Sequence, residues 1–90
     1  VMVNLGKVDS DLLVSRLQML IHEQSVYRTK GFAELPNKMM RQVVQGVSSR
    51  IDRSYDRRWG VDEERSTKLQ IIGRGLDAER LLATLRVAEV

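Results

Sequence analysis

The chain lacks cysteine and any long apolar run, and it has few aromatic residues and a single proline. Without cysteine it can form no disulfide bond and offers no thiolate ligand to a metal ion. No apolar stretch approaches the roughly 20 residues that span a bilayer. The first five residues, Val1 to Leu5, lack the basic region and the cleavage site of a signal peptide. These absences predict a cytoplasmic protein that has no contact with membranes.

Motifs for nucleotide binding and catalysis are also missing. The phosphate-loop pattern G-x-x-x-x-G-K followed by Ser or Thr does not occur, nor does the dinucleotide pattern G-x-G-x-x-G. Residues 73–75, Gly-Arg-Gly, precede an expected helix, but Asp77 at its start would repel an anion. His22 has no second His or Cys with which to hold a metal, and Asp62-Glu63-Glu64 is more typical of a solvated acidic turn. We predict that the chain is not an enzyme and has no cofactor and no metal site.

Two segments carry the 3.6-residue apolar period of an amphipathic helix. The first is expected from Ser10 to Gln24 and the second from Ala78 to Ala88. Asp9 and Asp77 precede them, where an aspartate can accept hydrogen bonds from the free N–H groups of the first turn. The apolar faces consist of Leu13, Leu17, Leu20 and Ile21 in the first helix and Leu81, Leu82 and Leu85 in the second.

Between these helices the apolar period changes to two, as in strands. Gly31 lies inside one expected strand and indicates a bulge or a close backbone approach. Residues 36–38, Pro-Asn-Lys, predict a turn. The expected strands are Val26–Leu35, Met39–Val47, Ile51–Trp59 and Thr67–Arg74, with a further one at Val1–Leu5. The order (β)αββββα predicts an α+β fold of two layers, ferredoxin-like, in which two helices cover one face of a four- to five-stranded, mainly antiparallel sheet.

The stretch from residue 50 to residue 59 allows two interpretations. It contains four arginines and two aspartates, and so has a net charge of +2. Alternation places Ile51, Arg53, Tyr55, Arg57 and Trp59 on one face of the strand and only polar side chains on the other. The first interpretation is a small sheet-based RNA-binding module, on which bases stack and phosphates pair. The second is that the aromatic residues cover the edge of the core and the arginines stack on them. We favour the second, because an RNA-binding sheet needs aromatic residues on two adjacent central strands and the chain has one Phe.

Four short segments together resemble a known family. They are Lys30-Gly31-Phe32, Gln45-Gly46-Val47, Asp56-Arg57-Arg58-Trp59, and Ile72-Gly73 with Leu76-Asp77. This set, spread over nearly the whole chain, is similar to the C-terminal domain of CobW-type proteins, which are P-loop GTPases linked to metal trafficking and cobalamin biosynthesis. Arg58 lies where the family often has proline.

The resemblance implies that residues 1–90 form a single C-terminal domain and that the chain is a fragment of a longer GTPase. Residue 1 is Val rather than an initiator Met, which fits that expectation. In the family, the nucleotide motifs and a Cys-containing metal motif belong to the N-terminal GTPase domain, and this chain contains neither. The resemblance therefore implies an accessory domain of a metallochaperone. Its expected partners are the P-loop GTPase domain of the same protein and a client protein that receives metal, and nucleic acid is disfavoured.

Four residues are the candidate interface of this domain. Arg57 and Trp59 lie at the end of a charged strand, directly before Gly60, and Arg and Trp are enriched at the centres of protein interfaces. Arg28 and Lys30, from the strand that contains the Lys-Gly-Phe segment, complete the set. The alternative for Trp59 is that it caps the core of its own domain, with Arg57 stacked on it.

Overall fold

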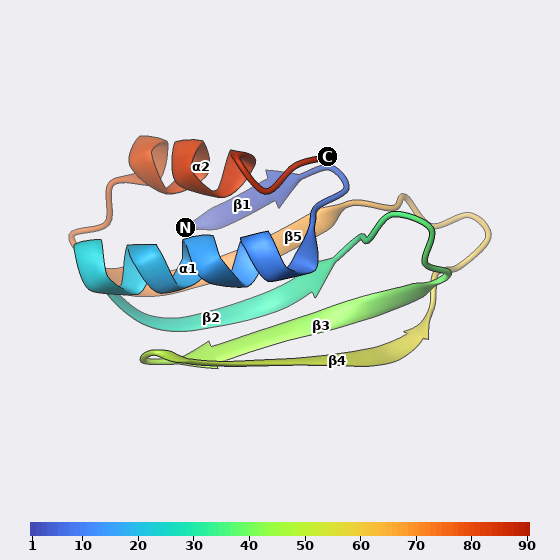
Figure 1. Ribbon diagram of the computed structural model, residues 1–90, viewed down its shortest axis with the longest axis horizontal. Coiled ribbons are helices and arrows are strands. Elements are labelled where there is room, and N and C mark those ends of the chain that lie inside the picture. The colour runs from blue at the N-terminus through green and yellow to red at the C-terminus, as the bar shows by residue number, and fades with distance from the viewer.

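Five strands and two helices follow one another in the order β1, α1, β2, β3, β4, β5, α2 in the computed structural model, which describes residues 1–90 (Figure 1). Their bounds are β1 Met2–Leu5, α1 Ser10–Glu23, β2 Ser25–Ala33, β3 Met40–Val47, β4 Arg50–Arg58, β5 Thr67–Arg74 and α2 Ala78–Arg86. The predicted order is confirmed, and the first segment does form a strand. No helix is long and apolar enough to cross a membrane.

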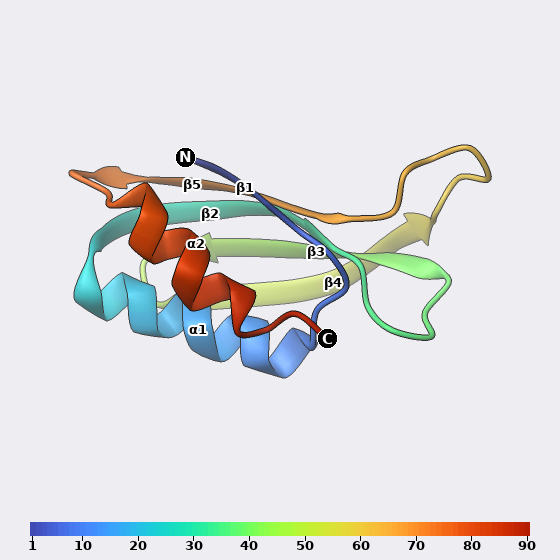
Figure 2. The ribbon, with the colours of Figure 1, turned by 90° about the horizontal axis from the view of Figure 1, so that it is seen from above.

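The strands form one sheet in the order β1-β5-β2-β3-β4, and all neighbours are antiparallel. Both helices lie on the same side of this sheet, as the two perpendicular views show (Figures 1 and 2). The two-layer α+β fold predicted from the sequence is therefore confirmed. After β4 the chain crosses through residues 59–66, so that β5 inserts between β1 and β2 and β4 is left at the edge.

Several predicted bounds were wrong by one or two residues. The helix α2 ends at Arg86 rather than Ala88, because the chain then turns and pairs with the segment before α1. There, the N–H of Val90 donates to the carbonyl of Lys7, and the N–H of Asp9 donates to the carbonyl of Ala88. Smaller differences concern α1, which ends at Glu23 rather than Gln24, and the strands β2, β3 and β4, which run over 25–33, 40–47 and 50–58.

The helix starts follow the predicted capping. The Asp9 carboxylate accepts a hydrogen bond of 2.9 Å from the N–H of Leu12, and the Asp77 carboxylate accepts one of 3.1 Å from the N–H of Arg80. These bonds satisfy N–H groups that have no partner within the helix. The leucines of both helices face the sheet and join the core. The largest fully buried core side chains are Leu13, Leu17, Leu20, Leu69, Ile71, Leu81 and Leu85.

Gly31 allows two central strands to approach closely, as the sequence indicated. A Cβ atom added at Gly31 would lie 2.8 Å from the Cα atom of Leu69 and would collide with the carbonyl of Lys68. Any side chain at this position would push β2 away from β5. The bulge of β2 is elsewhere: the register with β5 shifts between Val26 and Arg28, so that Tyr27 is the additional residue.

A second bulge divides the predicted face of β4. Tyr55 pairs with Gln42, whereas Arg57 pairs with Arg41, which leaves Asp56 as an additional residue. Because neighbouring residues of β3 point to opposite faces, Tyr55 and Arg57 also lie on opposite faces of the sheet. The prediction that Ile51, Arg53, Tyr55, Arg57 and Trp59 share one face was therefore wrong. Simple alternation cannot account for an inserted residue.

Candidate functional site

The side of the sheet opposite the helices, here called the open face, has no covering layer in this chain. The pairing of the strands places its side chains in four rows across the sheet. The first row is Ile72, Arg28, Val47 and Arg50; the second is Met2, Gln70, Lys30, Gln45 and Asp52; the third is Asn4, Lys68, Phe32, Val43 and Ser54; the fourth is Arg41 and Arg57. Basic side chains occur in every row, so the open face is the candidate functional site.

A hollow of about 540 Å³ lies over the first two rows. Its lining comes from β2, β3 and β4 and contains three cations and one carboxylate. The lining residues are Arg28, Thr29, Lys30, Gln45, Gly46, Val47, Arg50 and Asp52. Arg50 and Asp52 form an exposed ion pair of 3.4 Å, and the other two cations have no carboxylate partner among the ion pairs of the chain. The hollow is therefore open and positively charged.

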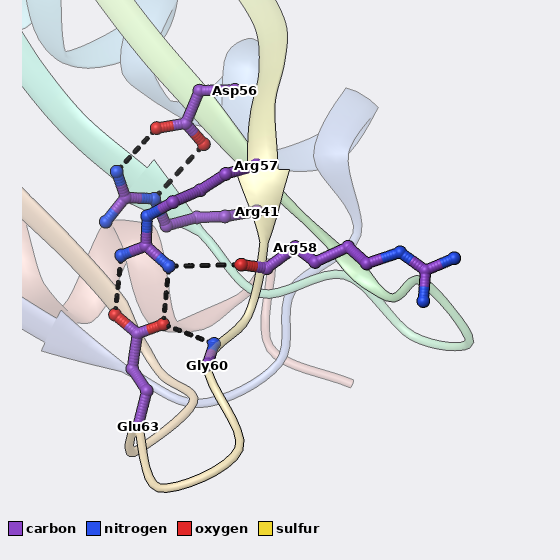
Figure 3. Close-up of polar contacts among 6 residues, drawn as sticks. All are labelled: Arg41, Asp56, Arg57, Arg58, Gly60 and Glu63. Carbon is purple, nitrogen blue, oxygen red and sulfur yellow. Dashed lines mark hydrogen bonds and ion pairs between the residues drawn. The ribbon is translucent and has the colours of Figure 1, made fainter.

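At the other end of the open face, the β4 bulge is held by an ion pair between Arg41 and Asp56 (Figure 3). The guanidinium of Arg41 donates to both oxygens of Asp56, from Nε at 3.2 Å and from Nη2 at 2.5 Å. The hydrogen bond from Arg41 keeps the pKa of Asp56 below its usual value. The same guanidinium lies 4.4 Å above the ring centre of Phe32, at a distance typical of a cation–π contact.

Arg57 holds the loop that follows β4. Its guanidinium donates two hydrogen bonds to Glu63, of 2.8 Å and 2.7 Å, and a third of 3.1 Å to the carbonyl of Arg58. The N–H of Gly60 donates to the same carboxylate at 2.9 Å. These donors, Arg57 first, lower the pKa of Glu63 to about 2. Figure 3 shows the Arg58 side chain pointing away from this cluster, toward solvent.

Trp59 packs within this domain. Its ring meets that of Phe32 edge to face, with centroids 5.7 Å apart, and only 6% of the residue is exposed. Its backbone N–H donates to the carbonyl of Met39. Arg41, Phe32 and Trp59 thus form one cluster on the open face. The ion pair of Arg57 and Glu63 holds the loop beside this cluster.

The four predicted interface residues lie on the open face but not in one place. Arg28 and Lys30 line the hollow, in the two rows nearest the β3–β4 turn. Arg57 and Trp59 lie at the opposite end of the face, by the loop that follows β4. The sequence interpretation missed Arg41, which joins Phe32 to the bulge. It also took Glu63 for part of a solvated acidic turn, although this residue is the partner of Arg57.

Other residues that the sequence analysis considered as ligand-binding candidates lie where no ligand site is formed. His22 is exposed in the last turn of α1. Gly75 has a φ of 61° and forms the turn between β5 and α2, a conformation that glycine adopts without strain. The structure brings together no group of three or more His, Asp or Glu side chains that could hold a metal ion.

Comparison with known proteins identifies the family of this domain. Residues 2–89 match the model of the C-terminal domain of the cobalamin synthesis protein CobW. The chain belongs to this family. It is 44% identical over 86 residues to the zinc chaperone CobW of Pseudomonas aeruginosa, and 47% identical over 72 residues to a zinc chaperone CobW of a Sinorhizobium species. These alignments cover 96% and 79% of the chain.

The fold is also that of a solved relative. The whole chain superposes on part of the crystal structure of Zn(II)-bound YjiA GTPase from E. coli, with a TM-score of 0.82 and 26% sequence identity. A Zn(II)-bound triple mutant of YjiA GTPase gives a TM-score of 0.83. The chain spans 29% of the length of these structures, and 23% and 20% of the two curated relatives. It therefore corresponds to one domain of much longer proteins.

Proposed function

We propose that this chain is the docking domain of a CobW-family GTPase and catalyses no reaction itself. Its partner is the GTPase domain of the same protein or a client protein that receives metal. The observation that supports this proposal most is the open face, a five-stranded sheet surface without a covering layer on a domain whose relatives are about four times as long. An exposed sheet face of this size with unpaired cations is suited to binding another protein.

The names of the relatives support a proposal for the activity of the whole protein. Two of them are named zinc chaperones and one is named a GTPase. We propose that the parent protein hydrolyses GTP and delivers zinc in the cytoplasm. In this proposal the chain supports metal supply or cobalamin synthesis by docking alone. Nucleotide and metal are then bound by the remainder of the protein, as the resemblance implies.

The exposed members of the candidate set form the contact in this proposal. Arg28, Lys30 and Arg57 present their side chains to solvent. Trp59 packs against Phe32 within the domain, and only 6% of it is exposed to a partner. Arg57 is already oriented by Glu63, which reduces the entropy that it loses when a partner binds.

A binding measurement tests the docking function. The isolated chain and a separately expressed GTPase domain of the same protein are expected to associate, and the chain alone is expected to bind no GTP in calorimetry with Mg²⁺ present. Arg57→Ala is expected to weaken the association roughly tenfold, as for an interface arginine, while the melting temperature of the domain stays nearly unchanged.

Arg86→Ala provides the matched control, because Arg86 is exposed on α2, away from the open face. This variant is expected to associate like the wild type. If Arg57→Ala instead unfolds the domain and the molecules that remain folded still associate normally, the contact of Arg57 is internal and the interface lies elsewhere.

A further inference from the structure

Three cations in the four rows of the open face form no ion pair within the chain. The chain has five ion pairs, and Arg28, Lys30 and Lys68 belong to none of them. Arg28 and Lys30 are two residues apart on β2, and Lys68 lies on the adjacent strand β5, opposite Phe32. By contrast, four of the five arginines on or beside β4 have a carboxylate partner, namely Arg41, Arg50, Arg53 and Arg57. Within the four rows, the unpaired positive charge is thus concentrated on β2 and β5.

Exposed aliphatic side chains flank these cations. In the first row Arg28 lies between Ile72 and Val47, which are 46% and 60% exposed. Met2, in the second row, is 61% exposed. A ligand that covers this area therefore meets positive charge and apolar surface side by side. Protein segments that contain both carboxylates and apolar side chains match such a surface, because each apolar group loses water while each carboxylate gains a cation.

The aromatic content of the open face disfavours a nucleic acid as the ligand. Phe32 is the single aromatic residue in the four rows, and Arg41 covers its ring. Trp59 is buried. Single-stranded nucleic acids are held largely by stacking of bases on exposed aromatic rings, and this surface offers none in its rows.

We propose that the hollow on the open face binds an acidic, extended segment of a partner protein, whose carboxylates pair with Arg28 and Lys30 and whose apolar side chains contact Val47 and Ile72. The proposal rests on the docking function and names the chemistry of the partner. Arg50 and Gln45 also line the hollow, and Asp52 is the one carboxylate in the lining that opposes the ligand.

The spacing of the two cations specifies the ligand further. Residues i and i+2 of a strand point to the same face and lie roughly 6.6 Å apart along it. Arg28 and Lys30 have this relation on β2. In an extended segment that runs along β2, carboxylates at alternate positions have the same separation. The expected ligand therefore carries Asp or Glu at every second residue.

Heteronuclear NMR titration of the chain with an acetylated, amidated hexapeptide, Thr-Glu repeated, tests this proposal. The expected result is saturable shifts of the amides of residues 28–30 and 45–47. The peptide with Gln in place of Glu is expected to give none. Arg28→Ala with Lys30→Ala is expected to raise the Kd roughly tenfold, since each lost surface ion pair contributes modestly. Asp52→Asn is expected to lower the Kd, because it removes the opposing carboxylate.

The double variant Lys7→Ala with Arg86→Ala is the matched control, because it also removes one lysine and one arginine, both exposed and outside the open face. Equal loss of binding in both double variants would show attraction to net charge alone and would overturn the proposal. Absence of shifts in the wild type would overturn it as well. A mixed-sequence single-stranded RNA of about ten nucleotides, chosen to fill a single-strand site, is a further probe. The proposal would be overturned if this RNA bound the chain more tightly than the peptide and lost binding in the Arg28/Lys30 variant.

The GTPase-domain titration separates this proposal from the docking function. If the GTPase domain binds the wild type and loses affinity for Arg57→Ala, but the hexapeptide gives no shifts, docking stands and the acidic-segment site fails. If the hexapeptide binds as expected but the GTPase domain does not associate with the chain, docking on that domain fails while the site stands.

Discussion

The strands β4 and β5 have similar lengths, yet their sequences and environments differ: β4 is mostly charged, whereas apolar and polar side chains alternate in most of β5. In β5 the side chains of Thr67, Leu69 and Ile71 are buried, because the strand lies between β1 and β2 and its inward side chains join the leucines of both helices. In β4 no residue is buried. Being at the edge, β4 has one neighbouring strand, and it contacts α1 through polar groups of Arg53.

This difference indicates a division of tasks within one sheet. The half around β5 contains the apolar core, which provides most of the stabilisation of a small domain. The half around β4 is held by strand pairing and by ion pairs at the surface, each of which contributes little to stability. Charged side chains on an edge strand also oppose uncontrolled pairing with other strands.

Truncation of one apolar residue in each half is the strongest test of this division. Leu69→Ala is expected to destabilise the domain by ~2–5 kcal/mol, because Leu69 is fully buried and leaves a cavity. Ile51→Ala on β4 is expected to cost less, since Ile51 is only partly buried. Urea unfolding of both variants measures the two losses. Similar losses would show that the β4 half belongs to the same core.

Glycine-to-alanine substitutions compare the strand contacts of the two halves. Gly31→Ala is expected to destabilise by ~1–3 kcal/mol through overpacking, because its new methyl group would meet the backbone of β5. Gly46→Ala on β3 is expected to be milder. There the added Cβ would lie 3.3 Å from Cγ1 of Ile51, a side-chain atom that can move. Thermal unfolding distinguishes the two, and a greater loss for Gly46→Ala would contradict the comparison.

The ion pair that joins β4 to α1 is expected to contribute little. Arg53 donates to the carboxylate of Asp11 at 2.7 Å, but Asp11 is 90% exposed. In a double-mutant cycle of Arg53→Ala and Asp11→Ala, the coupling is expected to be under ~1 kcal/mol. A larger coupling would mean that β4 is anchored to the helical layer more firmly than its exposure indicates.

The smallest effect concerns pH. Glu63 titrates in the folded state at about 2 instead of its ordinary 4.5, chiefly because Arg57 donates to it. A depressed folded-state pKa contributes stability above the unfolded value, and this contribution disappears as the pH falls from 4.5 toward 2. NMR titration of the carboxyl group is expected to show the low midpoint in the wild type and a return toward 4.5 in Arg57→Ala. A midpoint near 4.5 in the wild type would show that the pair does not persist in solution.

Much of the fold could be predicted because local signals were strong. The aspartates at positions 9 and 77 cap both helices, and the leucine stripe of each helix faces the sheet. Gly31 correctly predicted a close approach of backbones, which occurs between β2 and β5. The faces of β4 could not be predicted in the same way, because the additional residue Asp56 reverses the alternation and only the register with β3 reveals it. The place of Trp59 beside Phe32 depends on that reversal.

Prediction of the candidate site from the sequence had the same limit, because contacts between distant residues were not visible. The four candidate residues were found by type and by their position in the chain, and all of them lie on the open face. Their separation into two groups, and the pairing of Arg57 with Glu63, depend on contacts between strands and loops that the chain order does not reveal.

Local sequence by itself determined the elements of this protein, their order and the apolar faces that drive them together, since periodicity and capping act over a few neighbouring residues. Tertiary structure alone decided that β5 inserts between β1 and β2, which leaves β4 at the edge. It also decided which cations retain no partner. The physical reason is that strand neighbours and ion pairs join residues far apart in the chain, and their choice depends on which arrangement buries the shared core.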